Sequence, residues 1–175
     1  MKRLMLLAAV LMTLIAVPAA MAADTMKLGY VDLQKALNMS SAGKAAKDKM
    51  KAKFKDYEAD VQKKQEELKK LKEDLEKQAM LLSAEARATK ERDYQQKVKD
   101  YQRLTKDIQE ELQQTDADYT RKILEDIFKV VQQIGKQDGF TLILEKTESS
   151  ILYASDGIDM TDRVIQAFDK QSAGR

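Results

Sequence analysis

The feature that most constrains this chain is a heptad pattern of apolar side chains that runs from Lys44 to about Ile134. When Met50 is counted as a d position, the pattern indicates a single reversal of the chain near Ser83. There, Ser83 precedes Ala84 and an acidic residue, as a helix N-cap does. We therefore predict two antiparallel helical arms, each about 60 Å long. The predicted seam residues are Phe54, Tyr57, Val61, Leu68, Leu71, Leu75 and Leu82, with polar d positions at Lys64 and Gln78, followed by Tyr94, Val98, Tyr101, Thr105, Ile108, Leu112, Thr115 and Tyr119.

Beyond Tyr119 the apolar spacing changes, with an extra four-residue step of the kind that locally unwinds a coiled coil. The shifted seam consists of Ile123, Ile127, Val130 and Ile134. We expect the second arm to meet the rest of the protein there. The only proline is Pro18, so no proline after it stops or kinks a helix.

Residues 1–22 have the composition of a secretory signal peptide. Lys2 and Arg3 precede an apolar run that ends before Pro18, and small residues follow up to Ala22. The run is shorter than the roughly 20 residues that span a bilayer. We predict cleavage after Ala22 and export to the periplasm, and an uncleaved inner-membrane anchor is the competing interpretation.

Composition excludes several classes of function. The chain has 31 basic and 29 acidic side chains, and loss of Lys2 and Arg3 would make the two counts equal, which argues against a general nucleic-acid binder. It contains no Cys, so no disulfide stabilises it, and no His, which removes the commonest general base and metal ligand. Two paired helices also enclose too little core for an active site. We predict a protein that is not an enzyme and needs no cofactor or metal.

Charge is unevenly distributed along the two arms. The stretch from Lys44 to Lys55 is basic apart from Asp48, whereas residues 107–118 contain five acidic side chains and no basic one. Folding at Ser83 brings these stretches together, which favours the antiparallel register. Solvated helix faces are an equally good explanation, because exposed ion pairs contribute only about 0–1 kcal/mol each. At the tip, the basic candidates for binding anionic headgroups or acidic clients are Arg87, Lys90 and Arg92, and a solvated tip explains them equally well.

Both ends of the predicted mature chain contribute to a small base. Residues 27–31, 140–146 and 150–154 read as short strands, Asp32 to Leu37 as a helical turn or two, and Thr161 or Asp159 as the cap of a final amphipathic helix. The domain division is thus a base of residues 23–43 and 135–175 and an arm of residues 44–134. The expected buried strand positions are Leu28, Tyr30, Val31, Phe140, Leu142, Leu144, Ile151 and Tyr153.

A base of about 60 residues is marginal on its own, and three short strands leave open sheet edges. Exposed edges with apolar faces pair with other chains. We predict an oligomer held together by the base, without a number of copies fixed by these considerations.

Three segments carry a family resemblance: KLGYVDLQKALNMSSAGKAA from Lys27, LLSAEARATKERDY at the turn, and FTLILEKTESSILYASDGIDMTDRVIQAF from Phe140. Together they resemble the Skp (OmpH-like) family of periplasmic chaperones. The resemblance implies a mostly α fold in which long coiled-coil hairpins project, jellyfish-like, from a small strand-rich trimerisation domain. It also implies an ATP-independent holdase that keeps unfolded outer-membrane proteins soluble in a cavity between the arms.

The family also associates with anionic lipid and lipopolysaccharide, but its proposed lipopolysaccharide-binding basic cluster has no residue-by-residue match here, so no such site is assigned. The main functional alternative is a periplasmic coiled-coil adaptor or spacer whose hairpin docks on a partner helix bundle. Adaptors of that kind carry a much larger β-rich body than the segments that flank this hairpin.

Overall fold

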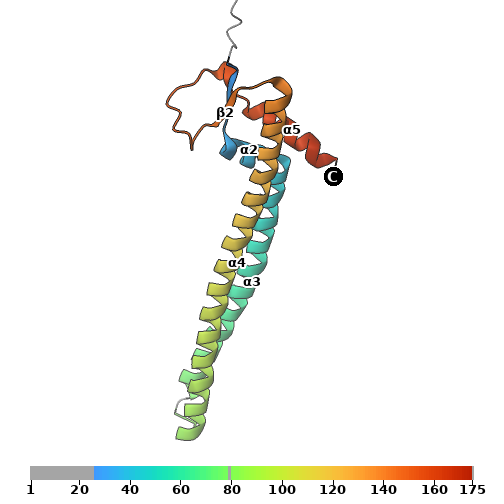
Figure 1. The fold of residues 1–175 in the computed structure, drawn as a ribbon. Helices are drawn as coiled ribbons and strands as arrows, with labels where there is room; N and C mark the ends of the chain where they lie inside the picture. The colour runs from blue at the N-terminus through green and yellow to red at the C-terminus, as the bar shows by residue number, and fades with distance from the viewer. Residues whose placement is uncertain (1–25, 79, 175) are drawn as a thin grey trace, which may run out of the picture.

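The protein is a long helical hairpin that projects from a small base, as Figure 1 shows. A computed structural model describes residues 26–78 and 80–174, so the predicted signal peptide lies outside the described residues. The elements in chain order are strand β1 (Leu28–Val31), helix α2 (Leu33–Met39), helix α3 (Ser41–Gln78), helix α4 (Ala84–Asp138), strand β2 (Leu142–Glu145), a 3-10 turn (Asp156–Ile158) and helix α5 (Thr161–Ala173). The prediction of a mostly α fold with a small β base is confirmed.

The arms, α3 and α4, lie side by side along their length and are joined by a short tip. Ser83 caps α4, since its side chain accepts a hydrogen bond from the Ala86 amide at 3.3 Å. Ser40 does the same for the start of α3, accepting from Gly43 N at 3.1 Å. Gly43 is required there, because a Cβ at this position would lie 1.7 Å from the Leu37 carbonyl oxygen.

The seam between the arms is half-buried along its length, and α3 has no fully buried residue among those described. The polar d position Lys64 is exposed, and the apolar positions of the predicted seam are correct except at Phe54, whose side chain is 57% exposed. Lys53, one position earlier, is half-buried and takes the place of Phe54 in the contact with α4. A lysine fits because its methylene stem packs along apolar surface while its amine reaches a partner.

The core lies where the arms meet the base. Four side chains of α4 are buried there, namely Ile123, Ile127, Val130 and Ile134, which are the residues of the shifted seam. They pack with Val31 and Ala36 from the start of the chain and with Met160, Val164 and Phe168 from its end. The last four turns of α4 therefore belong to the same core as the base, and α2 and α5 cover it.

The sheet has two strands, and they are parallel. β1 pairs with β2 in the register Leu28↔Leu142, so the whole hairpin serves as the connection between them. Gly139 ends α4 in the left-handed conformation, with φ of 69°, and this turns the chain into β2. A single parallel bridge from Tyr30 to Asp159 extends the pairing on the other side of β1.

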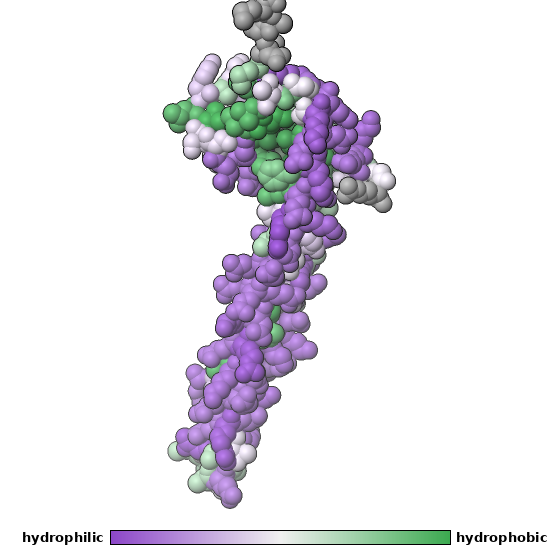
Figure 2. Space-filling model, viewed as in Figure 1, coloured by the Kyte–Doolittle hydropathy of each residue, from purple (hydrophilic) through white to green (hydrophobic). Residues whose placement is uncertain are grey.

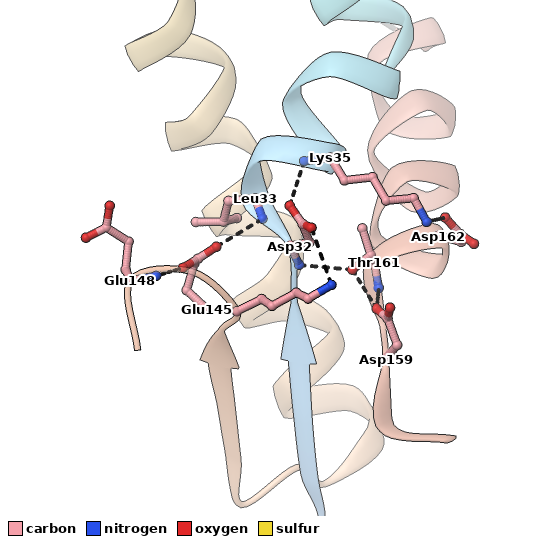
Figure 3. Close-up of polar contacts among 9 residues, drawn as sticks. Asp32, Leu33, Lys35, Glu145, Glu148, Asp159, Thr161 and Asp162 are labelled. Atoms are coloured by element: carbon pink, nitrogen blue, oxygen red, sulfur yellow. Dashed lines mark hydrogen bonds and ion pairs between the residues drawn. The ribbon is translucent and has the colours of Figure 1, made fainter. Parts of the chain in front are cut away.

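A polar network joins the strand ends to the helices that follow (Figure 3). The buried Thr161 hydroxyl donates to Asp159 at 2.5 Å and accepts from the Asp32 amide at 2.9 Å. Asp32 also caps α2 through the Lys35 amide. Burial raises the pKa of Asp159, but hydrogen bonds from Thr161 and Tyr30 lower it more, so that carboxyl titrates below its usual range.

Candidate interaction surfaces

One face of the small sheet is apolar and exposed. Leu28 from β1 and Leu142 and Leu144 from β2 are 44%, 45% and 38% exposed, and the strand register sets the first beside the second. Ile143, which alternates with them, packs toward the core. Figure 2 shows that apolar side chains gather on the base, whereas the visible face of the arms is mainly hydrophilic.

The segment that follows β2 is not a strand in the single chain, so the prediction of a strand over residues 150–154 is wrong. Its backbone turns repeatedly, with Ser150 at a φ of 52°, and forms the wide loop beside β2 in Figure 1. Leu152 is fully exposed and Tyr153 is 89% exposed, while Ile151 is half-buried. The segment does carry apolar side chains, but a strand needs a neighbour, and this segment has none within the described part of its own chain.

Among the other predicted base residues, Val31 is buried in the core, and Phe140 is half-buried with the Lys27 amine 4.2 Å from its ring centre. Tyr30 is also buried, but as the register partner of Leu144 it lies on the same sheet face as the three leucines. Desolvation by burial raises the pKa of the Tyr30 phenol, and the negative charge of Asp159 adds to this. Of the eight predicted positions, Val31, Phe140 and Tyr30 are covered within the single chain, whereas Leu28, Leu142, Leu144 and Tyr153 leave an apolar surface uncovered.

At the arm root, a polar contact joins α3 to α4. The Lys53 amine lies 2.7 Å from a Glu111 carboxylate oxygen and 3.3 Å from the Thr115 hydroxyl. Glu111 raises the pKa of Lys53, and the hydrogen bond from Lys53, with a second from Tyr57, lowers the pKa of Glu111. Among the ion pairs of the described residues, this is the one that joins the arms, and the heptad pattern alone assigns its position to Phe54.

The arm carries grooves beside the seam. One, with a volume of about 460 Å³, is bordered by Phe54, Tyr57, Val61, Ile108 and Leu112. A smaller one of about 280 Å³, nearer the tip, is lined by Leu68, Leu71, Tyr101 and Leu104 and rimmed by charged side chains. Tyr101 therefore packs in the seam and also contributes to an open groove.

The basic residues of the tip already have local partners. The Arg87 side chain pairs with Glu91 at 2.8 Å, Lys90 donates to the Gln78 side chain, and Arg92 donates to a backbone carbonyl one turn earlier. These three side chains are exposed, and each is held by a different partner. In the described part of the chain, no helix is long and apolar enough to cross a membrane.

A sequence model of the outer membrane protein (OmpH-like) family matches residues 27–168, from the start of β1 into α5. The chain belongs to the OmpH-like family. A search of the curated proteins finds no match.

Among solved structures, this OmpH-like chain is similar to a crystal structure from Caulobacter crescentus CB15, proposed there to be an outer membrane chaperone (OmpH-like). The TM-score is 0.78 at 18% sequence identity, and the match covers 83% of this chain and 85% of the other. At this identity the likeness shows a shared fold. The residues that the OmpH-like family model matches include the exposed sheet face, the Lys53–Glu111 contact and the grooves.

Proposed function

We propose that this OmpH-like protein is an ATP-independent holdase chaperone of the periplasm. In this proposal three copies assemble through the base, and their arms surround a cavity that holds unfolded outer-membrane β-barrel proteins until they are delivered for assembly. The observation that carries the proposal is family membership over most of the chain, combined with an apolar sheet face that the single chain leaves uncovered.

The base supplies the argument for self-association. Leu28, Leu142 and Leu144 lie on one face of the sheet and are exposed, and the exposed side chains of Leu152 and Tyr153 lie in the adjoining loop. Covering apolar surface of this kind stabilises an assembly by about 25 cal/mol for each Å² removed from water. A neighbouring copy would also supply the strand partner that residues 150–154 lack in their own chain. The base is therefore the proposed oligomerisation site, and three is the number that the family resemblance implies.

The arms supply the argument for holding clients. A holdase needs many weak contacts over a large surface, so that a client is shielded without being fixed in one geometry. The two arms offer long polar faces interrupted by apolar grooves, and their seam has no fully buried side chain among the described residues of α3. A seam of this kind opens locally at low cost, which lets the cavity adapt to clients of different size.

Location and lipid contacts complete the proposal. A cleaved leader at residues 1–22 would bring the protein to the periplasm, where no ATP is supplied. Anionic lipid is a further proposed partner, with Arg87, Lys90 and Arg92 as the candidate contacts at the tip. Lipopolysaccharide is also a proposed partner, without an assigned site. No nucleic acid, metal or cofactor enters the proposed function.

The test is mass by light scattering on the mature protein, alone and with an unfolded outer-membrane β-barrel protein diluted from urea. We expect a trimer of about 50 kDa, given a 19.9 kDa chain that loses its leader, and a discrete soluble complex with the client. A stable oligomer that leaves the client to aggregate would instead favour a structural adaptor that docks on a partner helix bundle.

A further inference from the structure

The root of α3 carries a stripe of lysines without partners. Lys44, Lys47, Lys51 and Lys55 follow one another at spacings of three, four and four residues, which places them on one face of the helix. All four are exposed, and no ion pair holds any of them within the described part of the chain. These four residues are called the basic stripe below.

The opposing stretch of α4 is acidic. Asp107 lies four residues before Glu111 and Asp118 lies seven after it, so at about 100° per residue the three carboxylates share one side of the helix within about 40°. Asp118 has an exposed partner one turn away, Arg121, and itself remains 55% exposed. These three residues are called the acidic face.

The basic stripe and the acidic face do not meet within one hairpin. Lys53 points at the acidic face and pairs with Glu111. The basic stripe is rotated from Lys53 by about 120–200° around the α3 axis, and so lies away from that contact. Its edge residue Lys47 lines a separate groove with Asp116 and Tyr119 of α4. Each arm root therefore has a mainly basic side, with Asp116 at its border, and an acidic side that faces in a different direction.

The basic stripe also borders uncovered apolar surface. Phe54 lies seven residues after Lys47, and therefore on nearly the same face, and it is 57% exposed. Beside it opens the groove of about 460 Å³ that Val61, Ile108 and Leu112 help to line. A partner that brings carboxylates to the basic stripe would cover Phe54 as well.

We propose that the acidic face of a second copy of this chain docks on the basic stripe and Phe54. This inference rests on the oligomer of the proposed function. Each copy would contact one neighbour through its basic stripe and the other through its acidic face. Such head-to-tail (heterologous) contacts form a closed ring when the rotation between copies closes. Neighbouring arm roots are then held side by side, the gaps between them near the base are shut, and the tips stay free to move.

The first experiment measures distances between arm tips in the intact oligomer. The chain has no Cys, so Met80→Cys at the tip, where Met80 is 96% exposed, gives one spin-label site per copy. We expect short, narrowly distributed tip distances in dilute salt and longer, broader ones in concentrated salt, since the screening length falls from about 30 Å at 0.01 M to about 3 Å at 1 M.

A charge swap tests the assigned faces. The triple variant Lys47→Glu, Lys51→Glu and Lys55→Glu should show the long, broad distances even in dilute salt. Adding Asp107→Lys and Asp118→Lys should restore the short ones. The matched control makes the same charge change on another face of α3, through Lys63→Glu, Lys70→Glu and Lys77→Glu, and should leave the distances as in the parent.

A cross-link gives a second, independent measurement. Lys47 and Asp118 lie at nearly the same height on the arm, because the sum of their numbers is close to that of the Lys53–Glu111 pair. The variant Lys47→Cys with Asp118→Cys should form disulfides between copies on mild oxidation, seen as a ladder of linked chains in a non-reducing gel. Either single variant should give none.

The outcomes separate this inference from the proposed function. An oligomer of unchanged mass whose tip distances ignore salt and the charge swap would overturn the arm contact and leave the holdase proposal standing. The arm contact is equally overturned if the triple variant loses client binding but keeps its tip distances, since the basic stripe would then face the client. A monomer would overturn both.

Discussion

The core at the junction of arms and base makes Ile127→Ala the most informative single substitution. Ile127 is fully buried among residues from both ends of the described chain. The change removes three carbon atoms, worth about 2.4 kcal/mol in transfer free energy at about 0.8 kcal/mol each, and the cavity left behind adds to this. We expect the free energy of unfolding to fall by about 3–4 kcal/mol.

For a chain of this length, each kcal/mol lowers Tm by about 2–4 °C, so the variant should melt about 10 °C below the parent. The measurement is thermal unfolding by circular dichroism, at one fixed protomer concentration because assembly shifts Tm. Leu81→Ala is the matched control, since Leu81 is 85% exposed at the tip and should change Tm by less than about 2 °C. Equal losses in the two variants would refute the assignment of the core to the arm root.

Three further predictions concern the base, the seam and the Lys53–Glu111 pair. Leu142→Asp should split the oligomer at low micromolar concentration, as measured by light scattering. The single chain should still fold, because Leu142 is 45% exposed in it. If the variant stays assembled, the proposed interface is wrong. Tyr101→Ala should lower Tm without loss of client retention if the residue serves the seam, and lost retention at unchanged Tm would instead assign it to client contact. Lys53 lowers the pKa of Glu111, so their pair stabilises the fold above the usual glutamate pKa of about 4.3, and this stabilisation is lost as the pH falls through the lowered pKa. Glu111→Gln should therefore weaken the loss of Tm at acid pH, as measured by thermal unfolding across pH. An unchanged dependence of Tm on pH would show that the pair contributes nothing to stability.

The arms were predictable because their signal is repeated. A seam of 3.5-residue period over two stretches, with a serine cap between them, leaves few folds open, and the shifted seam from Ile123 onward identified the buried part of α4. Phe54 was the exception. Which of two adjacent side chains enters a thin seam depends on the partner that it meets, and Lys53 meets both Glu111 and Thr115. Such a partner cannot be read from one helix alone.

The base was less predictable, because its strands are short and their partners are distant. The alternation of residues 142–145 placed Leu142 and Leu144 on one face correctly. The same kind of pattern in residues 150–154 produced no strand, since strand formation depends on an available edge and not only on side-chain pattern. The parallel pairing of β1 with β2 follows from chain topology, which no local signal encodes.

That parallel pairing sets the order in which the molecule can fold. Leu28 and Leu142 are register partners across 114 positions of chain, so the sheet of the base depends on contacts of long sequence separation. Closing an open loop of about 110 residues costs about 3 kcal/mol more in chain entropy than closing a five-residue turn. If α3 and α4 pair first at Ser83 and then progressively toward the base, each paired turn shortens the open loop between β1 and β2. The two strands are then already close together when they pair. The hairpin is then the template on which the base folds, and substitutions at the tip should slow folding even though the tip contributes little to the finished core.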